Sequence, residues 1–196
     1  MGSHRDHWRR TASRYLFESR WFNLRQDQVQ LPGGESITYT LVEHPGFAMI
    51  VPLLADGRVI LERVFRYTNQ DVVLECPSGG LDGEPPEVAA RRELEEETGW
   101  TAGRMESLGT FYSANGNSDA KAHLFLATDL SEDGTVAREV TEEIELVMMP
   151  LDDAIRAVFD GRLLDEPSAL ALLIAERKLR EPGRGRAQES RDGPRS

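Results

Sequence analysis

Several residue types are scarce in this chain of 196 residues. Cysteine occurs once, at Cys76, which excludes a disulfide within the chain. Aromatic residues make up 7% of the sequence, and no hydrophobic run approaches the roughly 18 residues that a membrane-spanning helix needs. The first residues, MGSHRDHWRR, contain no apolar segment typical of a signal peptide. We therefore expect a cytoplasmic protein that has no membrane partner.

Positive charge is also in the minority. The chain has 23 Lys and Arg against 34 Asp and Glu, a formal net charge of −11 at pH 7. Nonspecific binding to nucleic acid requires clustered Lys and Arg, so nucleic acid is not an expected partner. No combination of Ser, His and Asp, or of Cys and His, indicates a covalent nucleophile. A reaction at this protein is therefore expected to use water.

Hydrophobic periodicity predicts a mixed α/β fold, in which hairpins in the first part are followed by helices and further strands. Turn residues such as Pro32, Gly33 and Gly34 separate the early strands, so these are expected to pair antiparallel. The expected strands are 14–30 with a break near Trp21, 36–44, 47–54, 58–66, 72–76, 105–113, 122–129 and 143–149, and the expected helices are 85–98, 151–160 and 167–180.

The most informative stretch is GGLDGEPPEVAARRELEEETGW. Proline suits the first turn of a helix and glycine the residue just after its end, so Pro85, Pro86 and Gly99 bound the expected helix. Glu93, Glu96 and Glu97 fall on one face of it. Like charges this close cost a few tenths of a kcal/mol per pair, roughly, and a cation would remove that cost. A set of oxygen ligands favours Mg²⁺ or Mn²⁺, which protein carboxylates commonly share with substrate phosphates.

This stretch resembles the box of the Nudix hydrolase family, G-x5-E-x7-R-E-U-x-E-E-x-G-U, where U is aliphatic or aromatic. Every position from Glu84 to Trp100 matches. The first glycine departs from the pattern: counting back from Glu84 reaches Ser78, whereas alignment of the preceding ECPSG reaches Gly79. The resemblance implies that a backbone carbonyl here binds metal, so both Ser78 and Gly79 are candidates.

The resemblance also implies roles for the remaining box residues. Glu93 and Glu97 would bind the metal directly, and Glu96 would bind it directly or through water and take part in catalysis. Glu84 and Arg92 would form an ion pair that joins the loop to the helix, whereas Gly99 ends the helix. The alternative is that this ion pair is an ordinary surface contact, which would stabilise the fold by at most about 1 kcal/mol.

Other stretches resemble the subgroup of ADP-ribose and nucleoside-diphosphate-sugar pyrophosphatases. In REVTEEIEL, the resemblance implies that Glu142 activates the attacking water, and the adjacent Glu143 is an alternative. Both residues would also fit the solvent-exposed face of an edge strand without any catalytic role. Arg66 would bind phosphate, and Ser118 and Asp119 would contact substrate. Ala114 replaces the marker proline of ADP-ribose enzymes, which leaves other sugar nucleotides, such as GDP-mannose, as alternatives.

The family resemblance implies an α/β/α sandwich with a mixed sheet and an N-terminal antiparallel extension. The expected organisation is a flexible segment 1–12, an extension 13–45 that contacts a second copy in a homodimer, a catalytic domain 46–180 and a disordered tail 181–196. The implied function is Mg²⁺-dependent hydrolysis of a nucleoside diphosphate linked to a second moiety, such as ADP-ribose. The alternatives are a nucleotide-binding module without activity and, through Cys76, a prenyl-diphosphate isomerase.

Overall fold

The computed structural model describes residues 7–138 and 143–180. Its elements, in chain order, are β1 (Arg9–Glu18), β2 (Asn23–Gln30), β3 (Ser36–Glu43), β4 (Phe47–Pro52), β5 (Arg58–Arg66), β6 (Asp71–Glu75), β7 (Ser78–Gly80), α1 (Pro86–Thr98), β8 (Thr101–Tyr112), β9 (Lys121–Ser131), β10 (Ile144–Pro150), α2 (Leu151–Phe159) and α3 (Glu166–Arg180).

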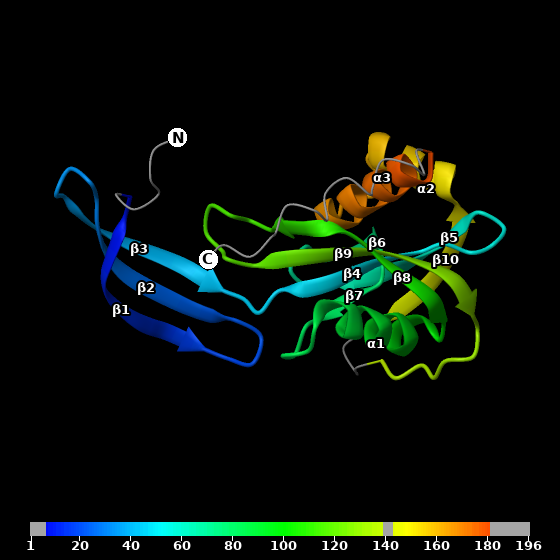
Figure 1. Ribbon diagram of the computed structural model, residues 1–196, viewed down its shortest axis with the longest axis horizontal. Helices are drawn as coiled ribbons and strands as arrows, with labels where there is room; N and C mark the ends of the chain where they lie inside the picture. The colour runs from blue at the N-terminus through cyan, green and yellow to red at the C-terminus, as the bar shows by residue number, and fades with distance from the viewer. Residues whose placement is uncertain (1–6, 139–142, 181–196) are drawn as a thin grey trace, which may run out of the picture.

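The first three strands form a sheet of their own, in the order β1-β2-β3, with both pairings antiparallel. This N-terminal sheet lies to one side of the remaining elements, and β3 leads directly into β4 (Figure 1). Strand β1 begins at Arg9, which pairs with Gln30, so the expected flexible segment 1–12 is wrong over its last residues. Residues 1–6 and the expected disordered tail 181–196 lie outside the described residues.

Two further sheets build the body of the molecule. One has the order β7-β4-β9-β8, in which β4 and β9 run parallel and the other pairs antiparallel; the second has the order β10-β5-β6. Successive residues of β4 point to opposite faces, as the period of a strand requires. Met49 and Val51 are buried in one hydrophobic core, whereas Ala48 and Ile50 are buried in another. The expected mixed sheet is therefore present.

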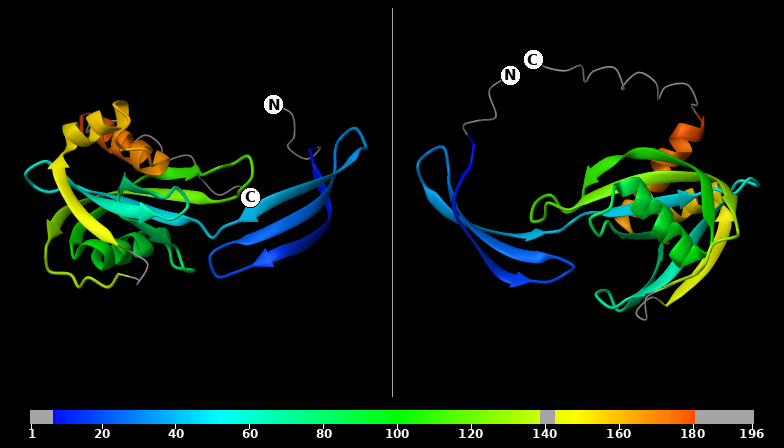
Figure 2. Two further views of the ribbon diagram at one scale, coloured as in Figure 1. Left: turned by 180° about the vertical axis from the view of Figure 1, so that it is seen from behind. Right: turned by 60° about the horizontal axis from the view of Figure 1, so that its bottom comes forward.

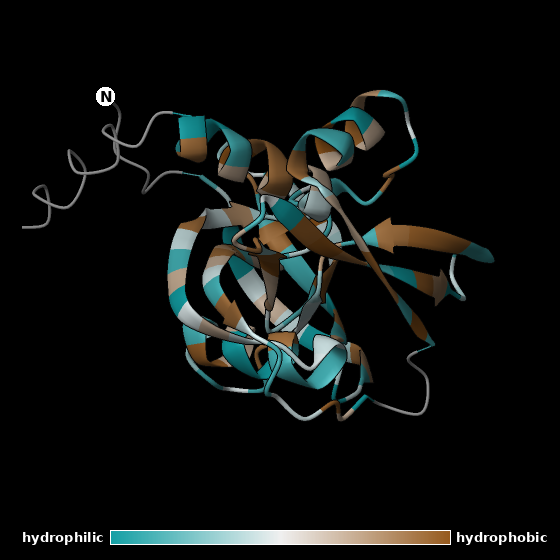
Figure 3. Ribbon diagram, turned by 90° about the vertical axis from the view of Figure 1, so that its right-hand side faces the viewer, coloured by the Kyte–Doolittle hydropathy of each residue, from teal (hydrophilic) through white to brown (hydrophobic). Residues whose placement is uncertain are grey.

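Helices cover the two faces of this body. Helix α1 packs on β4, β7 and β8, and α3 packs on β4 and β9 from the other side, together with α2 (Figures 1 and 2). Between them, β4 and the middle of β9 are buried on both faces, and hydrophobic segments lie at the centre of the molecule (Figure 3). This arrangement confirms the expected α/β/α sandwich. Within residues 7–138 and 143–180, every helix is too short or too polar to cross a membrane.

Two details of the strands differ from the expectation. Strand β7, Ser78–Gly80, was not expected, because two glycines in three residues give no alternating pattern; it forms by pairing with Phe47–Met49 of β4. Strand β8 begins at Thr101 rather than near 105, since its polar first residues pair with the end of β9. In both cases a distant partner strand supplies order that the local sequence does not encode.

Candidate active site

Helix α1 supplies the acidic wall of a pocket. Gly99 ends the helix in the left-handed conformation, with φ of 76°, and its N–H donates to the carbonyl of Glu95. Glu93 and Glu97 lie one turn apart, and only 8% and 6% of their surfaces are exposed. Glu96 lies beside them and is partly exposed. All three acids line the same pocket. The helix therefore concentrates negative charge at a place where two of the three carboxylates are largely shielded from solvent.

Strand β7 holds two of these carboxylates from the opposite side. The backbone N–H of Ser78 donates to Oε2 of Glu97 at 2.8 Å. At Gly79, an added Cβ would lie 2.0 Å from Cδ of Glu93, a separation that no real side chain tolerates. At Gly80 the nearest atom, Oδ1 of Asp82, would lie 3.5 Å away, an ordinary contact. A Cβ at position 79 would therefore force the carboxylate of Glu93 to move from its present place, whereas one at position 80 would not.

Arg92 joins the helix to the loop before it. Its Nε donates to Glu84 at 2.9 Å and its Nη2 to the carbonyl of Gly80 at 3.0 Å. Its Nη1 lies 2.6 Å from Oε1 of Glu93 and 3.2 Å from Oε2 of Glu96. Burial acts to lower the pKa of Arg92, but the hydrogen bonds to Glu84 and Glu93 outweigh burial and raise it. The expected Glu84–Arg92 pair is present, and the same guanidinium also spans two of the pocket's carboxylates.

The donors around the pocket fit a hard divalent cation. Among residues 7–138 and 143–180, no three His, Cys, Asp or Glu side chains converge as a ready-made metal cage. The guanidinium of Arg92 lies against Glu93 and Glu96 instead. Helix α1 and strand β7 nevertheless offer carboxylate and backbone oxygens, with no His or Cys, and the missing Cβ of Gly79 leaves the β7 backbone open to Glu93. Such oxygen-only sets suit Mg²⁺ or Mn²⁺ better than Zn²⁺.

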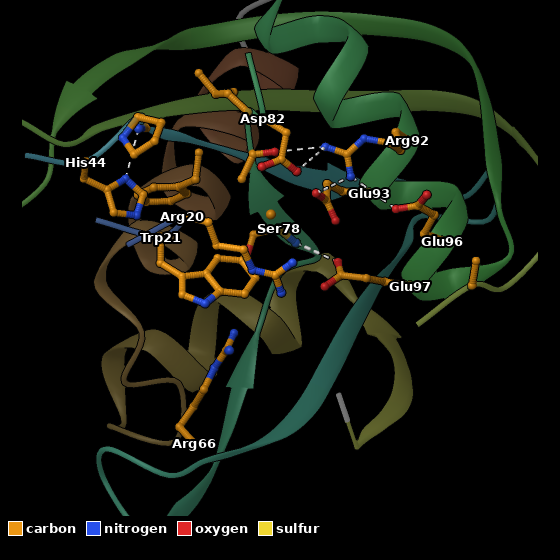
Figure 4. A pocket seen from close by; sticks show the side chains of 17 residues that line it. Arg20, Trp21, His44, Arg66, Ser78, Asp82, Arg92, Glu93, Glu96 and Glu97 are labelled. Carbon is orange, nitrogen blue, oxygen red and sulfur yellow. Dashed lines mark hydrogen bonds and ion pairs between the residues drawn. The ribbon is translucent and has the colours of Figure 1, made fainter. Parts of the chain in front are cut away.

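The opposite wall of the pocket is basic and aromatic. Figure 4 shows Arg20, Trp21 and Arg66 across the cavity from the carboxylates of α1. The guanidinium of Arg20 lies 3.9 Å from the centroid of the Trp21 ring. The cavity has a volume of about 310 Å³. Its lining residues are Arg20, Trp21, His44, Pro45, Gly46, Phe47, Arg66, Ser78, Gly79, Gly80, Leu81, Asp82, Arg92, Glu93, Glu96, Glu97 and Ala137.

Arg66, at the end of β5, is fixed by an acid on the neighbouring strand. Its Nε lies 3.0 Å from Oε1 of Glu75, and its Nη2 lies 2.5 Å from Oε2. The hydrogen bond to Glu75 raises the pKa of Arg66, and burial opposes that rise. The side chain remains 45% exposed. Arg66 therefore keeps part of its guanidinium available at the pocket wall while Glu75 sets its orientation.

Comparison with known proteins identifies the family and the fold. A family model of the NUDIX domain matches residues 42–169. The chain belongs to the Nudix family. A second model, the nucleoside diphosphate sugar hydrolase N-terminal domain, matches residues 8–42, which corresponds to the N-terminal sheet. The protein is therefore a Nudix hydrolase with an N-terminal extension, and Nudix hydrolases generally use a divalent metal.

Individual relatives agree with this assignment. The ADP-ribose pyrophosphatase of Bacillus subtilis (strain 168) is 33% identical to this Nudix hydrolase over 172 residues, covering 85% of this chain and 91% of the relative. A GDP-mannose pyrophosphatase of Yersinia pestis (strain Pestoides F) is 29% identical over 175 residues, covering 82% and 88%. The crystal structure of an ADP compounds hydrolase shares the fold, with a TM-score of 0.79 at 24% identity over 91% of this chain and 97% of that chain.

Ser118 and Asp119 of this Nudix hydrolase lie in the turn between β8 and β9. Neither lines the pocket. Oδ1 of Asp119 accepts a hydrogen bond from the N–H of His44 at 2.9 Å, and Oγ of Ser118 accepts one from Ala120 at 3.1 Å. Ala114 has a φ of 58°, which the ring of proline cannot adopt, so the turn differs locally from one that contains the marker proline. The expected substrate contacts of both residues gain no support from these positions.

Only one of the two candidates for the general base falls within the described residues. Glu142 falls outside the described residues. Glu143 is exposed, directly precedes β10 and does not line the pocket. Among the described residues, the nearest lining residue along the chain is Ala137, whose N–H donates to the carbonyl of Glu96 at 2.9 Å.

Sequence reasoning did not place Arg20 or His44 at the site. Both line the pocket, but they belong to the N-terminal sheet and the segment after it, far from the box in sequence. His44 is held by its own neighbours, since Nδ1 accepts a hydrogen bond from the N–H of Gly46 at 2.9 Å. In the sequence, Trp21 gave a weak indication of a binding role, because it is an aromatic residue at a break between strands. A single Arg or His gave no such indication.

Proposed function

We propose that this Nudix hydrolase is a Mg²⁺-dependent pyrophosphatase that acts on ADP-ribose or another nucleotide sugar. Water would attack the diphosphate, and the products would be a nucleoside monophosphate and a phosphorylated sugar. The observation that carries the proposal is one pocket with the buried acids Glu93 and Glu97 on one wall and Arg66 and Trp21 on the other. The relatives that act on ADP-ribose and GDP-mannose support this class of substrate.

The metal would be held by Glu93, Glu97 and Glu96, together with a carbonyl of Ser78 or Gly79. When bound, it would neutralise charge on the diphosphate and lower the pKa of an attacking water. The tight contact between Gly79 and Glu93 favours Gly79 as the carbonyl donor, because the β7 backbone there lies directly against the acid. Arg92 keeps the loop and the helix together through Glu84 and the carbonyl of Gly80.

The rest of the pocket would bind and orient the substrate. The exposed part of the Arg66 guanidinium would bind a phosphate oxygen, for which its planar set of donors is well suited. Trp21, of which 53% is exposed, offers a flat surface on which a nucleobase would stack. Arg20, which lies over that ring, adds positive charge near the phosphates. These residues would allow a chain with a net charge of −11 to bind an anionic nucleotide.

A glutamate after the box would remove the proton from the attacking water, and Glu142 and Glu143 are the candidates. Arg138 supports this region of the chain as the source of the base. Its Nε donates to the carbonyl of Glu97 at 2.7 Å, and its Nη1 donates to the carbonyl of Ile144 at 3.0 Å. One side chain thus connects the end of the acidic helix with the residue that follows Glu143.

The N-terminal sheet would join two copies into a homodimer. All ten residues of β1 are exposed, including the aromatic residues Tyr15 and Phe17. The strand also has an outer edge that no other strand covers within the described residues. Open edges and exposed aromatic residues are common at interfaces between protein chains. Sedimentation equilibrium of the full chain would test this, and a monomer at micromolar concentration would contradict it.

A panel of sugar nucleotides tests the proposed reaction. We expect turnover of ADP-ribose, GDP-mannose or a related compound in the presence of Mg²⁺, with a nucleoside monophosphate and a sugar phosphate identified by mass spectrometry. The removal of Mg²⁺ with a chelator should stop the reaction. The absence of turnover for every compound would contradict the proposal. Calorimetric binding of a nucleotide without any product would support the inactive binding module instead.

A further inference from the structure

The N-terminal sheet is connected to the catalytic domain at a second place besides the chain itself. The segment from Ala114 to Asp119, between β8 and β9, is called here the 114–119 turn. The hydroxyl of Tyr39, on β3, donates to the carbonyl of Gly116 at 2.6 Å. The N–H of Val42 donates to the carbonyl of Asn117 at 2.8 Å. Tyr39 therefore reaches across 77 positions of sequence to the catalytic domain.

Asp119 completes this connection from the other side. Its N–H donates to the carbonyl of Val42 at 3.3 Å, and its Oδ1 accepts the N–H of His44 at 2.9 Å. The turn is itself well ordered, since the carbonyl of Ala114 accepts hydrogen bonds from both Asn117 and Ser118. Polar groups of the turn thus hold the short segment through which β3 passes into β4.

The end of the same sheet at which β3 leads into β4 also carries residues of the pocket, because Asn23, just after the turn between β1 and β2, pairs with Glu43. The turn between β1 and β2 brings Arg20 and Trp21 to the cavity. That turn is closed locally, because Oγ of Ser19 accepts hydrogen bonds from Trp21 and Phe22 at 3.2 and 3.1 Å. Tyr39 also packs against Trp8, with ring centroids 5.9 Å apart and an edge-to-face arrangement. Hydrogen bonds join all three strands of the sheet, so the sheet would move as one unit. A change in the angle between the N-terminal sheet and the catalytic domain would therefore move Trp21 relative to α1.

We propose that the 114–119 turn fixes the angle of the N-terminal sheet and thereby places Trp21 opposite the acidic helix. Tyr39 and Asp119 are then positioning residues for the substrate, although neither lines the cavity. This assigns Asp119 a role in substrate binding that acts through the sheet rather than by contact. The inference rests on the proposed function for its kinetic test and is independent of it for its structural test.

The kinetic test compares Asp119→Ala and Tyr39→Phe with the parent chain, with ADP-ribose as the substrate. Loss of one such hydrogen bond should raise KM about tenfold and leave kcat within about twofold. Asp119→Asn should stay near the parent, since its amide oxygen still accepts the N–H of His44. Asn115→Ala is the matched control, because that exposed residue lies in the same turn.

A double-mutant cycle separates this mechanism from general damage. If Asp119 acts through Trp21, Asp119→Ala should raise KM no further in a Trp21→Ala chain. Additive effects of the two substitutions would overturn the inference. So would a fall in kcat with KM unchanged, because that result would place the effect on the chemistry rather than on binding.

The structural test requires no activity. Spin labels on Glu18→Cys, in β1, and Val88→Cys, in α1, report the distance between the sheet and the acidic helix; both sites are exposed, whereas Cys76 is buried and should remain unlabelled. Mixing the labelled protein with an excess of unlabelled protein ensures that each measured distance joins two labels on the same chain. Asp119→Ala and Tyr39→Phe should broaden or shift the distance distribution, and Asn115→Ala should leave it unchanged. An unchanged distribution in the first two would overturn the inference, even if no sugar nucleotide were hydrolysed.

Discussion

Gly79 lies so close to Glu93 that a Cβ at position 79 would fall 2.0 Å from Cδ and 2.1 Å from Oε1 of that acid. Ser78, one residue earlier, has a side chain and uses its N–H to bind Glu97. The two neighbours therefore perform different tasks: Ser78 orients one carboxylate by a hydrogen bond, and Gly79 makes room for the other. Packing, rather than spacing along the sequence, distinguishes them.

Gly79→Ala should displace Glu93 and impair the reaction. A shift of about 1 Å at a catalytic group can reduce activity by about 100-fold, and we expect a loss of that size in kcat/KM. Gly80→Ala is the matched control, since its Cβ would meet only Oδ1 of Asp82 at 3.5 Å. Steady-state kinetics with the substrate found in the panel measure both. Equal activity of the two variants would show that Glu93 does not need its present position.

Glu97→Gln should abolish most activity without unfolding the protein. The amide oxygen can still accept the N–H of Ser78, so the contact at 2.8 Å is retained while one negative charge is lost. Loss of a group that stabilises transition-state charge lowers kcat by about 100-fold or more. Calorimetric titration with Mg²⁺ should also show weaker binding. Glu87→Gln, an exposed acid on the same helix, should behave like the parent; if both variants did, Glu97 would not be a metal ligand.

Local signals in the sequence were enough to predict the acidic helix. Prolines at its start and Gly99 at its end bound it, and the expected range 85–98 agrees with Pro86–Thr98. Strand β7 could not be predicted in this way, because Ser78–Gly80 becomes a strand only when it pairs with β4. On the basic and aromatic wall of the pocket, the family resemblance indicated Arg66, but the rest of the wall was hidden for a similar reason. Arg20 and Trp21 reach the acids through tertiary structure, and no spacing along the chain connects them.

Arg92→Lys should destabilise the loop before α1. Lysine cannot reproduce the planar set of donors that contacts Glu84, Glu93 and the carbonyl of Gly80. The side chain is only 27% exposed, and we expect a loss of about 1–3 kcal/mol in the free energy of unfolding. Arg91→Lys is the control, since its pair with Glu87 is more exposed and worth less than about 1 kcal/mol. Urea unfolding measures both, and equal losses would contradict a special role for Arg92.

Cys76 should be unreactive in the folded protein. Only 1% of the residue is exposed, and burial raises the pKa of its thiol. The thiol therefore stays protonated at neutral pH, and the nucleophilic thiolate is scarce. Iodoacetamide should label Cys76 only under unfolding conditions, whereas an added cysteine at exposed Glu87 should react at once. Rapid labelling of native Cys76, together with loss of activity, would revive the prenyl-diphosphate isomerase alternative.

The general base can be identified by comparing Glu142→Gln with Glu143→Gln. Loss of a general base lowers kcat by about 10²–10⁴-fold, whereas loss of a solvated acid changes it little. Glu143 directly precedes Ile144. Arg138 donates hydrogen bonds to the carbonyls of both Ile144 and Glu97, so this region is held near the acidic helix. Glu145→Gln is the control, because that exposed residue pairs with Arg63 at 3.3 Å on the neighbouring strand. Mg²⁺ binding should be unchanged in all three variants. Full activity of both Glu142→Gln and Glu143→Gln would move the role to another acid, with Glu96 as the candidate on the pocket wall.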